Sequence, residues 1–347
     1  MLHSSPSHRI LIVSDAWLPQ VNGVVRTLST VALELRRMGH VVEVIGPDRF
    51  RTIPCPTYPD ISLSIFPARK LVRMIDNFRP DALHIATEGP LGLAARAWAI
   101  RTGFRFTTAF HTRFAEYVQA RIGLPVRPIY AWMRRFHGAG AGTMVATQSL
   151  REELAERGFT NIRAWSRGVD LDLFKPGDPD TTQREDWGLP RPIFLYVGRV
   201  AIEKNIRAFL DLDLPGSKVV VGGGPQLASL QRDYSNVHFT GPRHGEELAR
   251  AYAGGDVFMF PSLTDTFGLV ILEALACGTP VAAFPVTGPK DVLLLSDGKI
   301  GAVDIDLRRA ALEALTADRA ACRRHAERYS WRACAEVFLA HLVPLND

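Results

Sequence analysis

The sequence lacks the features of membrane-spanning and disulfide-bonded proteins. It contains no run of about 18 uncharged apolar residues, so we expect no membrane-spanning helix. The start, Met1–Arg9, is short and polar, and Ile10–Val13 already has the composition of a strand, which argues against a secretory signal peptide. The four cysteines show neither CxxC spacing nor the pattern of a disulfide framework, so we expect a reducing, cytoplasmic location.

Two further absences narrow the class of fold. No internal repeat or low-complexity segment stands out, which leaves ordinary folded domains. No GxGxxG follows the first predicted strand, so a dinucleotide-binding fold of the usual kind is disfavoured. The chain has 347 residues, 47% hydrophobic and 22% charged, which suits two globular domains of roughly 150 to 180 residues each.

The net charge of +5 is unevenly distributed along the chain. Residues 1–165 carry 21 Lys or Arg against 12 Asp or Glu, a net +9, whereas residues 166–347 carry 20 against 24, a net −4. A basic half joined to an acidic half indicates that only the first half meets something anionic and extended, such as a membrane surface. Alternatively, these arginines are ordinary solvated side chains on helices. We expect no nucleic-acid partner.

Short β-branched runs alternate with longer helical patterns, which predicts an α/β fold of parallel sheets covered by helices. In the first half the predicted strands are Ile10–Val13, Val41–Ile45, Ala82–Ile85, Phe106–Phe110 and Thr143–Thr147. In the second half they are Ile193–Val197, Lys218–Val221, Val237–Thr240, Val257–Phe260 and Val281–Phe284. Both halves therefore look doubly wound and Rossmann-like. A helix is predicted over Val24–Met38, with Gly39 as its stop.

The domain boundary is predicted near Trp165–Arg191, where Pro, Gly and Asp are dense enough for a linker. We expect one domain over residues 1–168 and another over residues 169–347, with the packing of the last helix, Ser330–His341, left open. Ligands of open parallel sheets bind beyond the carboxyl ends of the strands. The expected site is therefore a cleft where both sets of strand ends face each other.

The strongest motif, Pro261–Ala274, follows a predicted strand. It contains a polar loop, Gly268 and then a helix, whose start offers unpaired N–H groups and a partial positive charge to an anion. Asp265 and Glu273 flank that position, and carboxylates accept paired hydrogen bonds from the vicinal hydroxyls of a ribose or a hexose. In the alternative interpretation Asp265 or Thr266 merely caps the helix and Glu273 faces solvent.

A second motif, Gly198–Asn205, follows Ile193–Val197. Lys204 falls in the expected first turn of a helix, where a cation opposes the helix dipole by roughly 0.3–1 kcal/mol unless an anion offsets it. Arg199 offers a planar fork suited to phosphate, and Lys204 a compact point charge. Together the two motifs predict a diphosphate held by two cations and a helix start, with its sugars bound by the carboxylates. The alternative is an exposed Arg–Lys pair beside Glu203.

The first half contributes two weaker candidates. Asn22 and Gly23 come after the first predicted strand and can form a tight turn at a helix start, close to a phosphate or a sugar. His111 comes directly after Phe106–Phe110, at the carboxyl end of a strand. A lone histidine is more often structural than functional, and here both interpretations stay open.

These motifs resemble those of the retaining GT-B glycosyltransferases of family 4, and the resemblance covers nearly the whole chain. It rests on Pro19–Thr27, on Gly198-Arg199 with Lys204-Asn205, on the carboxylate loop and on Trp331. The subgroup that the chain looks like includes mannosyl-, glucosyl- or glucuronosyl-, and sulfoquinovosyltransferases that build glycolipids. The family's paired glutamates are separated by seven residues. Asp265 stands here in the first position, as is common in this subgroup, and Glu273 stands in the second at the same spacing.

The resemblance implies a role for each matched residue of the second half. Arg199 and Lys204 would hold the diphosphate. Asp265 would bind hydroxyls of the donor hexose, and Glu273 would bind the ribose. The main-chain amides expected near the sugar and the phosphate are those of Phe267, Gly268 and Leu269.

The resemblance also assigns residues of the first half. Gly23 would lie against the donor phosphate, and His111 against the transferred sugar. The Val221–Pro225 turn matches a family loop that often has an acidic residue where Gly223 stands, so we assign it no role.

With retention, the diphosphate leaves from the face that the acceptor hydroxyl attacks, and the departing phosphate can itself take the acceptor's proton. The two cations and the helix start stabilise the leaving phosphate, as a metal ion does in other transferases. We therefore expect no metal or other cofactor, and activity that survives EDTA. Four DxD sequences of the kind that metal-using transferases employ do not end a clear strand beside the diphosphate loop: Asp170–Asp172, Asp178–Asp180, Asp211–Asp213 and Asp304–Asp306.

The best clue to the acceptor is the basic segment Arg121–His137, which places Arg127, Arg134 and Arg135 among apolar and aromatic residues. This mixture suits an interfacial helix, so we expect peripheral contact with the anionic inner face of the cytoplasmic membrane. The acceptor would then be a lipid such as diacylglycerol or a lipid-linked glycan. The alternative is a core helix with a basic solvent face.

Other functions within the same fold stay open. A GDP-mannose-dependent α-mannosyltransferase of polysaccharide or lipopolysaccharide assembly would use the same residues. A GT-B phosphorylase or a sugar-nucleotide epimerase would use the same cleft. A non-catalytic sugar-nucleotide sensor would bind the donor without turnover. The sequence does not reveal the nucleotide base, the hexose or the acceptor.

Overall fold

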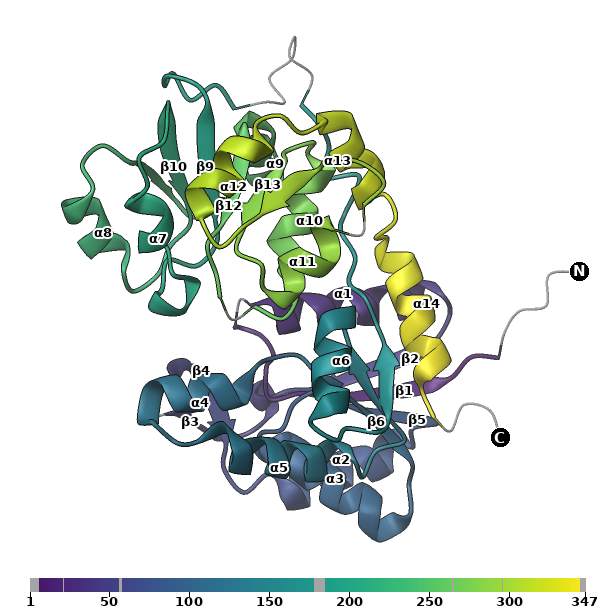
Figure 1. Cartoon of the computed structure of the whole chain (residues 1–347). Coiled ribbons are helices and arrows are strands. Elements are labelled where there is room, and N and C mark those ends of the chain that lie inside the picture. The colour runs from purple at the N-terminus through teal and green to yellow at the C-terminus, as the bar shows by residue number, and fades with distance from the viewer. Residues whose placement is uncertain are drawn as a thin grey trace, which may run out of the picture. The chain divides into compact units, whose positions relative to one another are not determined.

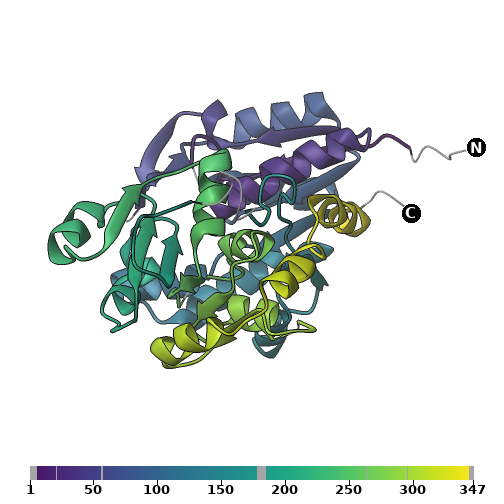
Figure 2. The same ribbon diagram turned by 90° about the horizontal axis from the view of Figure 1, so that it is seen from above.

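The computed structural model describes residues 6–20, 22–55, 58–177, 185–263, 265–294 and 296–343. The chain folds into two compact units, one made of Met1–Arg167 with Trp331–Asp347 and the other of Gly168–Ser330. Each unit is built on a six-stranded parallel sheet that is covered by helices (Figure 1, Figure 2).

The sheet of the first unit has the strand order β2-β1-β5-β6-β7-β8, and all neighbouring strands run parallel. Its strands are β1 (Arg9–Val13), β2 (Val41–Ile45), β5 (Ala82–Ile85), β6 (Phe106–Phe110), β7 (Gly142–Val145) and β8 (Ile162–Ala164). In this register Ile12 lies beside Val44 on one side and His84 on the other. A separate antiparallel pair is formed by β3 (Thr52–Cys55) and β4 (Tyr58–Ser64).

The helices of the first unit include one from the far end of the chain. They are α1 (Gly23–Arg37), α2 (Ala68–Phe78), α3 (Pro90–Thr102), α4 (Phe114–Ile122), α5 (Val126–His137), α6 (Gln148–Glu156) and α14 (Trp331–His341), with a 3-10 turn η1 (Pro47–Arg49). α14 packs against α1 (Figure 1). It is also anchored from the sheet side, because the buried Trp165 donates from Nε1 to the carbonyl of Cys334 at 3.1 Å.

The second unit repeats the plan with the strand order β11-β10-β9-β12-β13-β14, again all parallel. Its strands are β9 (Ile193–Val197), β10 (Ser217–Val221), β11 (His238–Gly241), β12 (Val257–Phe260), β13 (Val281–Ala283) and β14 (Gly301–Val303). Its helices are α7 (Arg207–Leu210), α8 (Leu227–Asp233), α9 (Gly245–Gly254), α10 (Leu269–Ala276), α11 (Thr287–Leu293), α12 (Leu307–Ala314) and α13 (Arg319–Ala326), with a 3-10 turn η2 (Ile202–Lys204).

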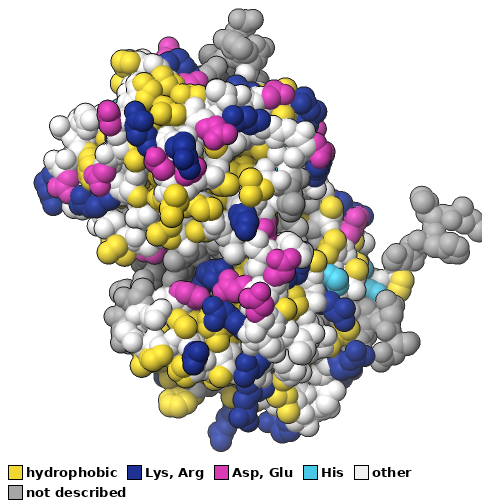
Figure 3. Space-filling view, in the orientation of Figure 1, with side chains coloured by type: hydrophobic (Ala, Val, Ile, Leu, Met, Phe, Trp, Pro, Cys, Tyr) yellow, Lys and Arg dark blue, Asp and Glu magenta, His cyan; other side chains and the backbone are white. Residues whose placement is uncertain are grey.

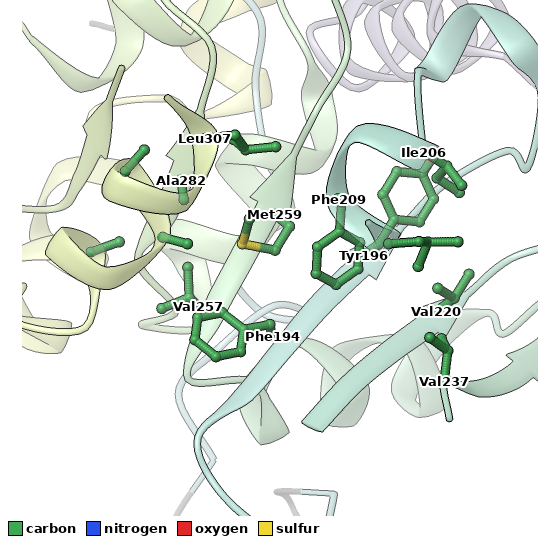
Figure 4. Packing of buried hydrophobic residues seen from close by; sticks show 14 of the residues in the cluster. Phe194, Tyr196, Ile206, Phe209, Val220, Val237, Val257, Met259, Ala282 and Leu307 are labelled. Carbon is green, nitrogen blue, oxygen red and sulfur yellow. The ribbon is translucent and has the colours of Figure 1, made fainter. Parts of the chain in front are cut away.

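Buried apolar side chains hold the second unit together. Every residue of β9 and β12 is buried, as expected for central parallel strands whose two faces are covered. Figure 4 shows Phe194 and Tyr196 of β9 with Met259 of β12, packed toward Phe209 of α7 and Leu307 of α12. Full burial of an apolar side chain of this size contributes about 1.5–3 kcal/mol. This core fixes the carboxyl ends of β9 and β12, where the predicted motifs begin.

The predicted α/β fold with two doubly wound units is confirmed. All ten predicted strands are present, and their ends differ from the prediction by at most two residues. The strands that the sequence did not indicate are β3, β4, β8 and β14. β8 and β14 are edge strands of three residues each, too short for an alternation pattern to be visible.

The predicted linker, Trp165–Arg191, is partly packed rather than open. Trp165 is fully buried, and Phe174 is 1% exposed, with its ring centroid 5.8 Å from that of Tyr252. Val169 forms a parallel β-bridge with Ser330, so the two ends of the second unit lie side by side. The linker prediction is therefore wrong over residues 165–174, where buried apolar residues outweigh the Pro, Gly and Asp content.

None of the helices in the described part of the chain is both long and apolar enough to cross a membrane. The four cysteines form no disulfide, and three of them, Cys277, Cys322 and Cys334, are buried.

Candidate functional site

Two loops of the second unit leave its sheet side by side. β9 and β12 are neighbouring parallel strands, so the loops that follow them emerge from the same edge. The side-chain amide of Asn205 donates to the carbonyl of Pro261 at 3.1 Å and joins the two loops. Asn205 has a φ of 51°, in the left-handed region that asparagine tolerates better than most residues. The two strongest motifs of the sequence therefore meet at one place.

An ion pair connects these loops in front of the sheet edge. Nζ of Lys204 lies 2.6 Å from Oδ1 and 2.8 Å from Oδ2 of Asp265. The two side chains are 27% and 18% exposed, so a ligand can reach both groups. A pair with this much solvent contact contributes on the order of 1 kcal/mol or less to stability. Stability alone is therefore a weak reason for a Lys–Asp pair at this edge.

Lys204 does not lie in the first turn of an α-helix, contrary to the prediction. It is the last residue of the 3-10 turn η2, and α7 begins only at Arg207. The argument from the helix dipole is therefore wrong. The charge of Lys204 is offset by the Asp265 carboxylate instead.

Arg199 is half-buried at the start of the same loop. The hydroxyl of Tyr196 donates to the carbonyl of Arg199 at 2.8 Å and so fixes its backbone. Burial, with the charges of Asp265 and Glu203 adding, raises the pKa of Tyr196, which keeps this hydroxyl a donor at neutral pH. The backbone of the Arg199 loop is therefore held by Tyr196 of β9.

The start of α10 depends on glycine. The N-cap residue is Gly268 with a φ of 84°, so neither Asp265 nor Thr266 is the N-cap residue. A Cβ on Gly268 would lie 2.9 Å from Cζ of Phe260, and its φ favours glycine in any case. Phe267 is only 5% exposed, so a ligand at the helix start can contact its backbone but not its side chain. The first amides of a helix have no intrahelical acceptor one turn before them, and here the amide of Ile271 donates to the carbonyl of Gly268 at 2.9 Å.

Glu273 is 2% exposed, so the alternative in which it faces solvent is wrong. Its Oε2 accepts from the hydroxyl of buried Tyr252 at 2.8 Å. A buried carboxylate is costly unless it is hydrogen-bonded, which is the role of this contact. Burial, with the charge of Glu273 adding, raises the pKa of Cys277, so this thiol stays neutral. Glu273 is thus an oriented acceptor in the second turn of α10.

The glycine turn Val221–Pro225, which has no role assigned from the sequence, supports the Arg199 loop. The amide of Val200 donates to the carbonyl of Gly223 at 2.8 Å, and the amide of Gly198 to the carbonyl of Val221 at 3.0 Å. A Cβ on Gly222 would lie 1.9 Å from the carbonyl oxygen of Gly198. The three consecutive glycines were the available signal, because close approach of two backbones requires glycine.

We expect Gly222→Ala to destabilise the second unit by about 3 kcal/mol, because the residue has a φ of 149° and its Cβ would overlap backbone. Gly223→Ala is the matched control, since its Cβ would come no closer than 3.7 Å to any atom, a Pro242 carbon. Urea denaturation of both variants and the wild type measures the difference. Equal stability of the two variants would contradict this explanation of the turn.

The candidates of the first unit lie after β1 and β6. Gly23 is the first residue of α1, and Asn22 caps that helix by accepting from the amides of Val24 and Val25 at 3.0 Å. Asn22 therefore has a structural role, while Gly23 supplies backbone at the helix start. His111 follows β6 directly, and its Nδ1 lies 3.2 Å from Nη2 of Arg167.

Asp15 is a residue of this edge that the sequence analysis did not single out. It is 5% exposed and accepts from the amides of Leu91 at 2.8 Å and Gly92 at 3.2 Å, at the start of α3. Thr87 Oγ1 donates to the same carboxylate at 2.9 Å. Burial raises its pKa, against these hydrogen bonds, which lower it. Its place directly after the first strand was the signal for it, and its role is to hold the β1 loop against α3.

The basic residues of α5 lie at the surface, as both interpretations of the sequence require. Arg127, Arg134 and Arg135 are exposed, and Nη1 of Arg134 donates to the carbonyl of Arg157 at 2.8 Å. The apolar residues among them that pack into the core are Tyr130, Met133 and Phe136. These three side chains pack α5 onto the core, whereas Trp132 on the same helix is 39% exposed, so a membrane contact of α5 stays a prediction.

The DxD sequences show no cation-binding arrangement in the described part of the chain. Oδ1 of Asp170 accepts from the amides of Asp172 and Leu173, and Oδ1 of Asp304 accepts from the amide of Asp306. These are local turn contacts. The sequence Asp178–Asp180 lies outside the described residues. Among the residues that are described, no three His, Cys, Asp or Glu side chains gather as a metal site.

Family models match both units of the chain. The model described as glycosyltransferase family 4 matches residues 21–173, and the model described as glycosyl transferases group 1 matches residues 191–315. The second match spans the Lys204 and Asp265 loops.

Curated relatives cover most of the chain. A GDP-mannose-dependent alpha-mannosyltransferase of Mycobacterium tuberculosis is 33% identical over 82% of this chain and 81% of its own length. A sulfoquinovosyl transferase of Arabidopsis thaliana is 29% identical over 95% of this chain and 72% of its own length. An alpha-monoglucosyldiacylglycerol synthase of Streptococcus pneumoniae is 28% identical over 89% of this chain and 78% of its own length.

A solved structure supports the fold. The Anabaena protein HepE in complex with UDP and glucose matches with a TM-score of 0.66 at 14% identity, over 96% of this chain and 98% of its own length. Two parallel-sheet, Rossmann-like units are the GT-B architecture that the resemblance implied. With the matched family models and the mannosyltransferase relative, they establish that this chain is a GT-B glycosyltransferase belonging to glycosyltransferase family 4.

Proposed function

We propose that this glycosyltransferase moves a hexose from a nucleoside diphosphate sugar to a hydroxyl of a lipid or a lipid-linked glycan, with retention at the anomeric carbon. The names of two relatives support the donor and the acceptor, since one is GDP-mannose-dependent and another makes a glucosyldiacylglycerol. The HepE complex with UDP and glucose supports the nucleotide-sugar class. The proposed cleft between the units stays a prediction.

The observation that carries the proposal is the Lys204–Asp265 pair in front of the β9 and β12 ends. A lysine ammonium has three N–H donors, so it can contact a phosphate oxygen while it remains near Asp265. Asp265 can then accept from sugar hydroxyls, with its position set by Lys204. Arg199 adds a second cation for the diphosphate, and Glu273 an oriented acceptor for the ribose hydroxyls.

In the proposed step, the bond between the anomeric carbon and the diphosphate oxygen breaks, and a bond from the acceptor oxygen to the same carbon forms. The acceptor's proton passes to the departing phosphate oxygen, so the step needs no separate base. The charge that grows on the leaving diphosphate is stabilised by Arg199, Lys204 and the amides at the start of α10. His111 and Gly23 are proposed to contact the sugar and the phosphate from the first unit.

A thermal-shift panel with GDP- and UDP-sugars tests the donor, because a ligand that binds the folded chain raises its melting temperature by mass action. We expect one nucleotide class to stabilise the protein, and GDP-mannose is the first candidate because of the mycobacterial relative. Stabilisation by GDP-mannose favours a GDP-mannose-dependent mannosyltransferase, whichever acceptor it uses. No shift with any nucleotide sugar would contradict the proposal.

We expect activity to be the same with and without EDTA, because the cationic side chains of Arg199 and Lys204 take the place of a metal beside the diphosphate. The measurement is the rate of nucleoside diphosphate release under both conditions. Loss of activity in EDTA that added magnesium restores would contradict the proposed metal independence.

We also propose peripheral contact with an anionic membrane at the inner face of the cytoplasmic membrane. Figure 3 shows Lys and Arg side chains gathered at the lower edge of the first unit, where Figure 1 places α2, α3 and α5. Because Tyr130, Met133 and Phe136 of α5 are buried, this contact would be mainly electrostatic and would weaken as the salt concentration rises.

We expect more protein to sediment with anionic than with neutral vesicles, and Arg127→Glu/Arg135→Glu to remove the difference. The matched control is Arg232→Glu/Lys299→Glu, the same charge change on exposed residues of the second unit. Equal sedimentation of the wild type with both kinds of vesicle would contradict the membrane proposal.

A further inference from the structure

The most unusual buried group of the first unit is the guanidinium of Arg167. The residue is 5% exposed and comes just after β8. Nη1 donates to the carbonyls of Trp165 at 2.9 Å and Ser166 at 3.2 Å, and the guanidinium carbon lies 4.5 Å above the Trp165 ring. In the part of the chain that the structure describes, Arg167 contacts these carbonyls, the Trp165 ring and the His111 ring, and no carboxylate is among these partners. A buried cation that is held by carbonyls and an aromatic face needs another reason for its place.

Arg167 contacts His111, one of the candidate residues for the donor sugar. Nη2 of Arg167 lies 3.2 Å from Nδ1 of His111. The His111 ring stands edge-on to Trp165, with centroids 5.8 Å apart. Trp165 is fully buried and held by the carbonyl of Cys334, so all three side chains form one fixed cluster.

The chemistry of this contact determines which ring nitrogen is protonated. A guanidinium has only donors, so Nδ1 of His111 must accept and cannot carry a proton. The single ring proton of the neutral imidazole is then on Nε2. A doubly protonated ring would place two N–H groups against each other at this contact.

Burial and the surrounding charges also favour the neutral form of the His111 ring. Burial, with Arg167, His84 and His137 adding, holds the pKa of His111 well below its ordinary value. Burial lowers the pKa of Arg167 to about 10, so the guanidinium is still charged at neutral pH. Burial also lowers the pKa of His84 on β5 to about 3, and His137 on α5 contacts Glu88 at 3.0 Å.

We propose that Arg167 is a positioning residue that fixes His111 as the neutral tautomer with its proton on Nε2. His111 is then a constant hydrogen-bond donor that adds no positive charge next to the reacting sugar. The use of this donor for a sugar hydroxyl rests on the proposed function, whereas the tautomer itself does not. Histidine tautomers of metal and triad sites are fixed in the same way by the partner of the other nitrogen.

Long-range proton–nitrogen NMR of the ligand-free, 15N-histidine-labelled full chain tests the tautomer, with His111→Gln identifying the signal. We expect the pattern of a neutral, Nε2-protonated ring that does not change between about pH 5.5 and pH 8.5, across the ordinary histidine pKa. A ring protonated on Nδ1, or one that titrates near its ordinary pKa, overturns the proposal. This result does not depend on any transferase activity.

Variants of Arg167 separate positioning from folding. Arg167→Met removes the donor and the charge, so His111 is expected to titrate within the measured range and kcat to fall about tenfold, the effect of one hydrogen bond. KM for the donor nucleotide should change little. Arg167→Lys keeps a donor and a charge and is expected to restore the Nε2 tautomer and most of kcat. If Arg167→Met leaves the tautomer and its pH response unchanged, the proposal fails; if it does not fold, the wild-type titration and Arg167→Lys decide.

Discussion

Replacing Lys204 with alanine is expected to lower kcat/KM for transfer by about a hundredfold to a thousandfold, the usual effect of removing one preorganised donor from a developing negative charge. The reason is the place of its ammonium, within 2.6 Å of Asp265 and at the edge where β9 and β12 end. In the proposed mode of donor binding, the variant loses a charge next to the leaving diphosphate, and it also leaves Asp265 without its lysine. Steady-state kinetics with saturating acceptor measure the effect.

Two companion variants make this result specific. Asp265→Asn keeps Lys204 and the shape of its partner, and is expected to lower the rate mainly through the sugar hydroxyls. Lys299→Ala is the control, because Lys299 forms an exposed pair with Glu313 and precedes β14, at the opposite end of the strands. If Lys204→Ala and Lys299→Ala have similar rates, Lys204 does not hold the diphosphate.

Glu273→Gln is expected to raise KM for the donor by about ten- to a hundredfold, with a smaller change in kcat. Two charge-assisted hydrogen bonds to ribose hydroxyls are each worth about 1.5–3 kcal/mol, and glutamine keeps the shape but not the charge. The ribose is remote from the breaking bond, so its contacts affect ground state and transition state equally. The affinity for free nucleoside diphosphate should fall by the same factor, which calorimetry measures.

A 2′-deoxynucleotide separates the ribose contact from a general loss of structure. It should bind the wild type weakly, and Glu273→Gln should bind it as well as the ordinary nucleotide, because the two changes remove the same interaction. Glu313→Gln, a change on an exposed side chain, is the control. Tyr252→Phe removes the hydroxyl that orients Glu273 and should have a smaller effect of the same kind. Additive losses from Glu273→Gln and the 2′-deoxynucleotide would place Glu273 away from the ribose.

The strands and the two candidate loops of the second unit were predictable because each depends on residues that are close in sequence. β9 and β12 are short apolar runs, and the loops after them carry Arg199, Lys204 and Asp265 within a few residues. Parallel strands place their carboxyl ends at one edge, so the meeting of the two loops follows from the fold class. The burial of Glu273 agrees with its position on a helix that is apolar on most sides.

The features that could not be predicted depend on contacts between distant parts of the chain, which a single sequence does not show. Three contacts each join segments separated by 24 to 61 residues: the close approach of Gly222 to Gly198, the pairing of Lys204 with Asp265, and the contact of Arg167 with His111. The burial of Tyr130, Met133 and Phe136 on α5 could not be predicted for a related reason. A helix with an apolar side has the same pattern whether that side meets a membrane or the unit's own core.

Hexose transfer by the purified protein, from GDP-mannose and from UDP-glucose to a lipid extract, tests the central claim most directly when wild type and Lys204→Ala are compared. Mass spectrometry follows the glycosylated lipid, and a coupled assay follows the nucleoside diphosphate. We predict that the wild type releases nucleoside diphosphate only when acceptor is present and forms an equal amount of product, and that Lys204→Ala forms almost none. Release without acceptor, or product formation that Lys204→Ala does not reduce, would contradict the account.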